Sequence, residues 1–158
     1  MDARIKWPND VLIEGKKIAG ILTEISTEMD LVDWVVVGLG LNVNTPADQM
    51  PPEIQPIATS VQIQKGGPFS RIELLCALLK NFEDCYELLK TDGFGPIMQQ
   101  WRQMTDIIGQ RVYVDVMETR HFGTVAAVDD DGVLILKDDQ GRTRRIFSGD
   151  VGKIRPNG

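Results

Sequence analysis

The chain has 158 residues and a formal net charge of −6 at pH 7, with 42% hydrophobic and 25% charged residues. This composition is typical of a folded globular protein and excludes intrinsic disorder. The negative charge argues against direct binding to nucleic acid and to anionic membrane surfaces.

The sequence carries no signal for secretion or for membrane insertion. No apolar run approaches the ~20 residues that cross a bilayer, and no apolar segment follows Met1 as in a signal peptide. We therefore expect a cytoplasmic protein. Cys76 and Cys85 lie nine positions apart in a predicted helix and should not bridge each other. With one histidine and no Cys-x-x-Cys pair, we expect no metal site.

The N-terminal part of the chain is predicted to form β-strands. Arg4–Trp7 is a short strand that ends before Pro8, which cannot donate to a sheet. Val11–Ile13 and Lys17–Ser26 flank the glycine-bearing segment Glu14–Lys16, which indicates a hairpin.

The segment Asp33–Val43 is predicted as a strand because its residues alternate with a period of two. One side carries only apolar side chains: Val35, Val37, Leu39, Leu41 and Val43. The other side carries Val36, Gly38, Gly40 and Asn42. Glycine inside a strand marks a place where a ligand or another backbone comes close, so we expect this side to form a shallow floor.

A long irregular stretch that contains four prolines separates these strands from a predicted helix at Ser70–Thr91. Ser70 and Glu73 form a capping-box pattern, and leucines follow at helical spacing. A second helix should begin near Pro96, a favoured first-turn residue. We expect its Trp101 and the leucine-rich face of the first helix to pack in a core.

From about residue 109 the pattern changes to short strands separated by glycine-containing turns. The predicted strands are Arg111–Met117, Gly123–Val128, Val133–Lys137 and Arg142–Phe147. Four or five short strands in about fifty residues are typical of a small SH3-like barrel. We therefore predict two domains, at residues 1–107 and 108–158.

Three short segments of the first half carry the chemistry: Lys6–Val11 (KWPNDV), Lys16–Leu22 (KKIAGIL) and Gly38–Asn44 (GLGLNVN). Each has an ordinary explanation by itself. The first is also a turn-forming sequence, and lysines beside Gly15 are typical of a solvated turn. The Gly-x-Gly pair lacks the third glycine of a dinucleotide fingerprint. Their occurrence together and in this order is what points to a function.

This ordered trio resembles the biotin protein ligases, also called biotin–acetyl-CoA-carboxylase ligases. The resemblance covers nearly the whole chain, including Ala58–Ser60 and the C-terminal barrel. It implies an α+β fold, in which part of a mixed sheet with helices, like that of class II aminoacyl-tRNA synthetases and biotin synthetases, precedes an SH3-like barrel. It also implies a reaction of biotin with Mg²⁺-ATP to biotinyl-5′-adenylate. Biotin then passes to a lysine of the biotin carboxyl carrier domain of a carboxylase.

By motif position, the resemblance makes Lys17 and Asp10 the catalytic residues. Lys17 would contact the biotin carboxyl group and the adenylate phosphate, where a fixed ammonium stabilises developing negative charge. Asp10 would orient the incoming lysine amine, which must lose a proton to react. Asn9 would shape the same corner of the substrate site.

The remaining substrate-binding residues follow from the same resemblance. Gly20 and Leu22 would line the biotin pocket, and Asn42 matches the asparagine that reads adenine. Gly38 and Gly40 would form the floor. One conflict arises, because strict alternation along the strand places Lys17 on the face opposite Gly20. Either the strand is irregular near the turn, or Lys17 reaches the site around its end.

The chain departs from the family pattern in one respect. A basic glycine-rich loop that folds over biotin and the phosphates precedes KWPND in the family, whereas only Met1–Ile5 precede it here. We therefore expect that this chain alone does not make the adenylate. Two alternatives stay open: a lipoate-attaching relative of the same fold, and a non-catalytic binding module. We expect a homodimer, since an incomplete sheet leaves unpaired strand edges.

Two further features lie in the predicted barrel. His121 follows Arg120 near a predicted turn and is expected to be an exposed, uninvolved side chain. Arg142, Arg144 and Arg145 form a small basic run, for which a solvated strand edge is the favoured interpretation. Contact with the carrier domain or with ATP is the functional alternative.

Overall fold

The computed structural model describes residues 1–29 and 31–154. The chain forms two compact units that are interleaved in sequence. The first unit consists of Met1–Ile5 and Asn9–Leu79, and the second of Lys6–Pro8 and the chain from Lys80 onward. The predicted boundary between residues 107 and 108 stays a prediction, and the second unit contains the predicted barrel together with residues that precede it.

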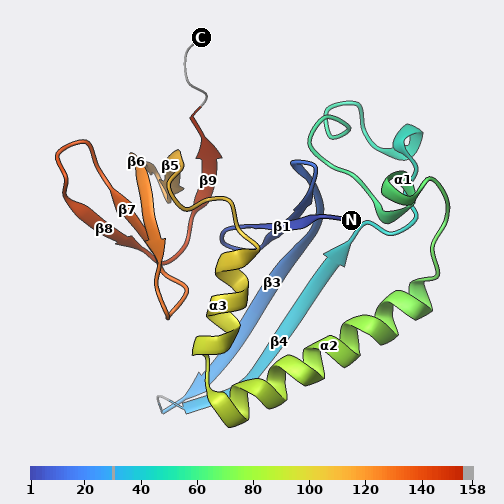
Figure 1. Ribbon diagram of the computed structural model, residues 1–158, viewed down its shortest axis with the longest axis horizontal. Helices are drawn as coiled ribbons and strands as arrows, with labels where there is room; N and C mark the ends of the chain where they lie inside the picture. Colours follow the sequence, from blue (N-terminus) through green and yellow to red (C-terminus); the bar gives the residue numbers. More distant parts are fainter. Residues whose placement is uncertain (30, 155–158) are drawn as a thin grey trace. The chain divides into compact units, whose positions relative to one another are not determined.

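The first unit is built on a four-stranded sheet with the order β1-β2-β3-β4. Its strands are β1 (Ala3–Lys6), β2 (Asp10–Ile13), β3 (Lys16–Glu28) and β4 (Leu31–Leu41). The two long strands β3 and β4 run side by side in opposite directions (Figure 1). Pairing of β3 with β2 is also antiparallel, and Lys17 makes a single parallel bridge to Ala58.

The predicted hairpin between β2 and β3 is confirmed. Glu14 and Gly15 both have positive φ angles, of 50° and 76°. Positive φ at both central residues is the geometry of the two-residue turn that suits the twist of a hairpin. Beyond the turn the register is interrupted, because Leu12 pairs with Lys17 whereas Val11 pairs with Ala19. Ile18 is therefore the extra residue of a β-bulge in β3.

The alternation predicted for the strand around residues 33–43 agrees with the register between β3 and β4. Gly40 pairs with Gly20, and Gly38 pairs with Leu22. Partners in an antiparallel pair share a face, so three glycines and Leu22 form one shallow area of the sheet. Farther along the two strands large apolar side chains are exposed, namely Ile25, Leu31, Val32, Trp34, Val35, Val36 and Val37.

A small core lies beneath the β2–β3 turn of the first unit. Its buried members are Ile13, Ile18, Ala19 and Val61. The stretch that was predicted to be irregular contains a 3₁₀ turn, η1 (Ala47–Gln49), and a short helix, α1 (Val61–Lys65). The Ser60 hydroxyl caps α1 by accepting a hydrogen bond from the backbone N–H of Ile63, at 3.2 Å.

Two longer helices follow, and both were predicted. The helix α2 (Arg71–Asp92) begins with the predicted cap, in which the Ser70 hydroxyl accepts from the N–H of Glu73 at 3.2 Å. The helix α3 (Gly95–Gln103) has Pro96 in its first turn. The expected core packing of the leucine-rich face of α2 holds only for Leu74, which is partly buried against the small core, whereas no residue of α2 is fully buried. Trp101 of α3 does pack against a core.

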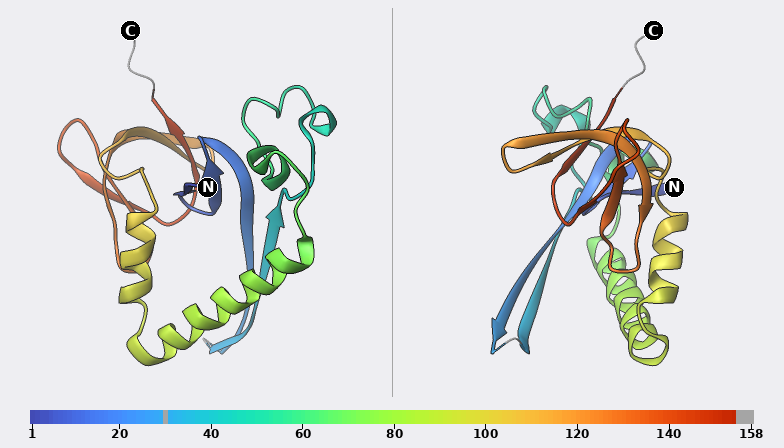
Figure 2. Two further views of the ribbon diagram at one scale, coloured as in Figure 1. Left: turned by 45° about the vertical axis from the view of Figure 1, so that its right-hand side comes forward. Right: turned by 90° about the vertical axis from the view of Figure 1, so that its left-hand side faces the viewer.

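The second unit contains a five-stranded sheet with the order β8-β7-β6-β5-β9. The strands are β5 (Arg111–Val116), β6 (Thr119–Val128), β7 (Leu134–Lys137), β8 (Thr143–Ile146) and β9 (Asp150–Lys153). They curve around a common interior (Figure 2), as expected for a small SH3-like barrel. The predicted α+β class is therefore confirmed.

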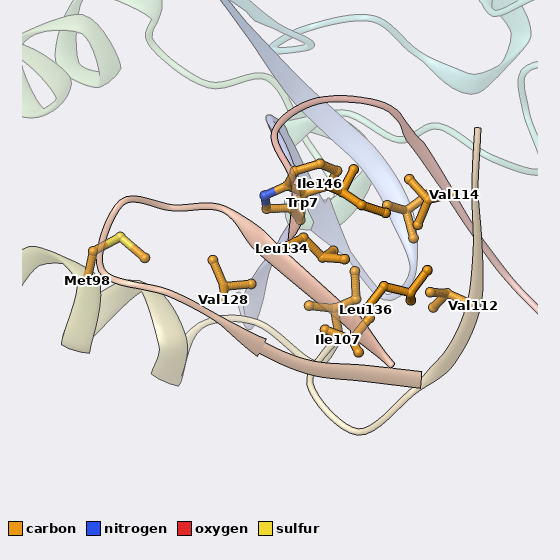
Figure 3. Packing of buried hydrophobic residues seen from close by; sticks show 11 residues of the cluster. Trp7, Met98, Ile107, Val112, Val114, Val128, Leu134, Leu136 and Ile146 are labelled. Carbon is orange, nitrogen blue, oxygen red and sulfur yellow. The ribbon is translucent and has the colours of Figure 1, made fainter. Parts of the chain in front are cut away.

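Trp7 belongs to the core of this second unit, which we call the barrel core. Its side chain is 3% exposed and lies beside Leu134 and Ile146 (Figure 3). The indole N–H donates to the backbone carbonyl of Gly132 at 3.0 Å. The other buried members are Met98, Ile107, Val112, Val114, Val125, Val128, Leu136 and Val151.

Two sequence expectations concern features outside these cores. Cys76 and Cys85 are exposed free thiols. Among the residues that the structure describes, no helix has the length and apolar character needed to span a membrane.

Candidate functional site

Lys17 and Asp10 form an ion pair at the turn-proximal end of the β2–β3 hairpin. The Lys17 ammonium lies 2.5 Å from the Asp10 carboxylate. The Asp10 side chain is 18% exposed and that of Lys17 is 48% exposed. Both predicted catalytic residues therefore meet, and the lysine retains access to solvent and to a ligand.

The β-bulge at Ile18 resolves the conflict over which face Lys17 occupies. Lys17 pairs with Leu12, and Gly20 pairs with Asp10. Leu12 and Asp10 are two residues apart in β2 and share a face, so Lys17 and Gly20 share that face as well. The strand is irregular near its turn, which was one of the two explanations left open by the sequence.

Asn9 is fixed to β3 by a pair of reciprocal hydrogen bonds. Its side-chain amide donates to the carbonyl of Ile21 at 2.7 Å, and the N–H of Ile21 donates to the carbonyl of Asn9 at 2.9 Å. These bonds hold the corner that precedes Asp10 against the neighbouring strand. Asn9 thus lies at the edge of the hollow, and its role in shaping a substrate site stays a prediction.

The backbone of Lys17 is held on its other side by the segment after the prolines. Its N–H donates to the carbonyl of Ile57, and its own carbonyl accepts from the N–H of Thr59, both at 2.8 Å. Lys17 is therefore bonded into the fold through its main chain, and its ammonium is held by the ion pair with Asp10. A fixed cation of this kind needs little reorganisation when it meets an anion.

A shallow hollow of about 440 Å³ opens beside the ion pair. It is lined by Asn9, Lys17, Gly20, Ile21, Leu22, Gly38, Leu39 and Gly40. Six of these residues were predicted for the site. Ile21 and Leu39 were missed, although each is the direct sequence neighbour of a predicted residue. Within this lining Lys17 is the charged side chain, so the hollow suits a ligand with an anionic group and an apolar part.

The structure does not bring Asn42 into this lining. Its side-chain amide donates to the carbonyl of Thr59 at 3.1 Å, and its N–H donates to the carbonyl of Ile18 at 2.9 Å. In this arrangement Asn42 joins β4 to the segment that holds Lys17. Its adenine-reading role stays a prediction.

The predicted features of the barrel lie on the surface of the second unit. His121, Arg142 and Arg144 border a separate hollow of about 630 Å³. Arg142 and Arg145 form ion pairs with Asp138 and Asp129, at 2.8 and 2.9 Å. The basic run at the start of β8 is thus partly neutralised by carboxylates of the barrel itself.

The described residues contain no group of three or more histidine, cysteine or acidic side chains that could hold a metal ion. The groups gathered at the hollow are an ammonium, a carboxylate and strand backbone. These groups can bind an anionic linkage and assist transfer to an amine.

Two family models match the chain. Residues 1–42 match the biotin/lipoate A/B protein ligase family, and residues 107–153 match the biotin protein ligase C-terminal domain. Together they cover more than half of the chain, including every residue of the hollow.

Curated relatives agree with these matches. A bifunctional ligase/repressor BirA of Bacillus spizizenii is 39% identical over 147 residues, which is 93% of this chain and 45% of that protein. A biotin–[acetyl-CoA-carboxylase] ligase of Paracoccus denitrificans is 36% identical over 87% of this chain and 58% of its own length. The chain thus spans about half the length of the curated relatives it matches.

Solved structures show the same likeness. The apo biotin protein ligase of Aquifex aeolicus has a TM-score of 0.84 and 26% identity, over 96% of this chain and 66% of that one. The same Aquifex enzyme in complex with biotin and ATP has a TM-score of 0.78 and 26% identity, over 99% of this chain and 63% of that one. Family models, relatives and fold all agree, and the chain therefore belongs to the biotin protein ligase family.

Proposed function

We propose that this chain forms part of a biotin–protein ligase that joins biotin to ATP and then transfers biotin to a carrier domain of a carboxylase. The observation that supports this most directly is the Lys17 ammonium, held 2.5 Å from Asp10 beside a floor of glycines. Biotin and Mg²⁺-ATP are substrates in this proposal. A cytoplasmic location is part of it, because carboxylases and ATP are found there.

Lys17 acts in the first step. The carboxylate of biotin attacks the α-phosphorus of ATP, a new P–O bond forms, and pyrophosphate leaves. Negative charge builds up on the oxygens around phosphorus, and a fixed ammonium stabilises it more than a mobile solvent cation does. Because its main chain is bonded on both edges, Lys17 has only a side chain to reposition.

Asp10 acts in the second step. The amine of the acceptor lysine attacks the acyl carbon of the adenylate, the C–N bond forms, and AMP leaves. The amine must lose a proton, and a carboxylate within reach can accept it. The contact with the Lys17 ammonium holds the Asp10 side chain in place before the acceptor arrives.

Biotin is favoured over lipoate as the acyl group. The C-terminal match is to a domain of biotin protein ligases, and the curated relatives carry ligase names that specify biotin. Leu22, which shares the face of the glycine floor, also supplies an apolar side chain to the hollow that suits a compact bicyclic ring. Binding of a lipoyl-adenylate analogue should therefore be weaker than that of its biotinyl counterpart.

Calorimetric titration with a non-hydrolysable biotinyl-adenylate analogue tests the proposed site. Lys17→Ala removes a charge-assisted contact worth about 1.5–3 kcal/mol, so we expect about 10- to 100-fold weaker binding. Lys16→Ala is the matched control, because the Lys16 ammonium donates to the carbonyl of Gln55 and lies outside the hollow. Equal affinities for both variants and the parent chain would remove Lys17 from the site.

A second candidate function is that of a non-catalytic assembly module that forms homodimers. The exposed apolar side chains along β3 and β4, such as Trp34 and Val36, favour it, because such patches mark interaction surfaces. Sedimentation analysis of the samples used for calorimetry separates the two candidates. A dimer that does not bind the analogue supports assembly alone, and saturable binding that requires Lys17 supports the ligase site.

A further inference from the structure

The contact between Lys17 and Asp10 depends on the register in which β2 and β3 pair. In a regular hairpin, the pairing of Lys17 with Leu12 would place Ala19 opposite Asp10. The bulge at Ile18 shifts the register by one residue, so Gly20 takes this place. Ile18 and Ala19 are both turned into the small core of the first unit, where they are buried.

The Lys17 side chain then passes over Gly20 to reach Asp10. A Cβ atom built on Gly20 would lie 3.0 Å from the Lys17 ammonium nitrogen and 3.1 Å from the adjoining carbon. The same atom would lie 3.5 Å from the Asp10 carboxylate. The ammonium therefore forms the ion pair by passing close to the position that a methyl group on residue 20 would occupy.

We propose that Gly20 is a positioning residue, whose missing side chain together with the bulge at Ile18 seats the Lys17 ammonium against Asp10. The family resemblance assigns Gly20 to the wall of the biotin pocket, whereas this role acts through Lys17. A side chain at position 20 would stand 3.0 Å from the ammonium, so the end of Lys17 must shift from the place in which it contacts Asp10. The link to catalysis rests on the proposed function, and the seating of Lys17 does not.

The fold itself does not need glycine at this position. The atoms that a methyl group would meet belong to the far ends of a flexible lysine and of Asp10, and they can move. Gly20→Ala should therefore fold normally and change the ion pair. Its cross-strand partner provides a matched control, because a Cβ on Gly40 would meet only the carbonyl of Gly20, at 3.8 Å.

The side-chain NMR signal of the Lys17 ammonium reads out the ion pair directly. In the parent chain and in Gly40→Ala, we expect the ammonium hydrogens to exchange slowly with water. In both backgrounds, Asp10→Asn should shift the Lys17 signal. In Gly20→Ala, we expect fast exchange and no response to Asp10→Asn. An unchanged Lys17 signal in Gly20→Ala would overturn the proposal.

A double-variant comparison tests whether Gly20 acts through Lys17. Gly20→Ala alone should weaken binding of the biotinyl-adenylate analogue about 10-fold, in line with loss of one charge-assisted contact. In a Lys17→Ala background, Gly20→Ala should weaken binding of the analogue by less than about 2-fold. Full additivity would mean that the methyl group blocks the ligand by itself. If the NMR result holds and no variant affects the analogue, the ligase function fails while the positioning role stands.

Discussion

Trp7 shows how much a single residue of the KWPND segment contributes to packing. It lies in the barrel core, 3% exposed, and its indole N–H is bonded to the carbonyl of Gly132. Its surroundings indicate a structural role, two positions before Asn9, which lines the hollow.

Replacing Trp7 tests this role. Loss of a buried aromatic side chain costs about 3–5 kcal/mol, so Trp7→Ala should lower the free energy of unfolding of the second unit by that amount. Trp7→Phe should cost less, because it keeps a ring and loses the N–H. Urea unfolding followed by the methyl NMR signals of Val114 and Leu134 reports on this unit alone.

Trp34→Ala is the control for that experiment, since Trp34 is exposed on β4. An exposed substitution should change the stability of the second unit by less than about 0.5 kcal/mol. Similar small effects of Trp7→Ala and Trp34→Ala would contradict the structural role of Trp7.

At the scale of single residues, the sequence predicted which side chains gather at the site but not how they meet. Lys17, Asp10 and the glycines were identified by motif. Their geometry depends on the bulge at Ile18, and bulges leave little trace in a pattern of apolar residues. Asn42 illustrates the same limit, because the hydrogen bond from its side-chain amide to the carbonyl of Thr59 depends on a segment 17 residues away in sequence.

At the scale of elements, the β5–β6 pair carries a surface ion pair with a defined pH dependence. Asp115 and Arg120 are direct cross-strand partners, and two hydrogen bonds join them, at 2.6 and 2.7 Å. The Arg120 guanidinium also lies over the ring of Tyr113, 4.1 Å from its centre. Hydrogen bonding by Arg120 lowers the pKa of Asp115 below its ordinary 3.8.

The sign of this shift predicts behaviour in acid. A carboxyl group with a lowered pKa stabilises the folded state above its unfolded pKa, and this contribution disappears as the pH falls through the folded value. Asp115→Asn should therefore lower the thermal midpoint at neutral pH, and the loss relative to the parent chain should shrink below about pH 4. Circular dichroism melts between neutral and acidic pH measure both effects.

The exposed Asp48 of η1 offers a comparison, because no ion pair to it is found in the described residues. Asp48→Asn should leave the difference between neutral and acidic midpoints as in the parent chain. If Asp115→Asn lowered the thermal midpoint by the same amount at every pH, the cause would be lost packing rather than lost charge.

The elements themselves were predicted where local signals are strong. The hairpin at Gly15 and the capped helix at Ser70 both follow rules of backbone geometry. The short helix α1 was missed, although Ser60 caps its start and Gly66, with a φ of 75°, ends it. Five residues contain too few turns for apolar periodicity to appear, so only the caps could have revealed it.

At the scale of the whole molecule, the described residues offer one charged side chain to the hollow, namely Lys17. Adenylate formation requires several donors arranged around the phosphates before the reaction begins. We therefore predict that the purified 158-residue chain releases no pyrophosphate from Mg²⁺-ATP and biotin above background. A coupled pyrophosphate assay checks this, with the biotinyl-adenylate analogue confirming that the same sample is folded and able to bind. Turnover at the rate of a complete ligase would contradict the prediction.

The burial of apolar surface was the feature least accessible from sequence at this scale. The leucine-rich face of α2 has the pattern of a core helix, yet most of its side chains are exposed and only Leu74 packs, partly buried, against the small core of the first unit. A periodic pattern shows that a face is suited to burial, and it does not show what covers that face.

The place of Trp7 in the barrel core also bears on how the chain folds as it is made. Its hydrogen-bond partner Gly132 is synthesised 125 residues later, and its neighbour Ile146 follows later still. At ribosomal speeds of about 5–20 residues per second, the tryptophan waits for several seconds without its partners. Throughout that time an unburied indole is available to chaperones or to misfolding partners. In the second unit, Trp7 is therefore synthesised first but can be buried only after the strands that cover it have been made.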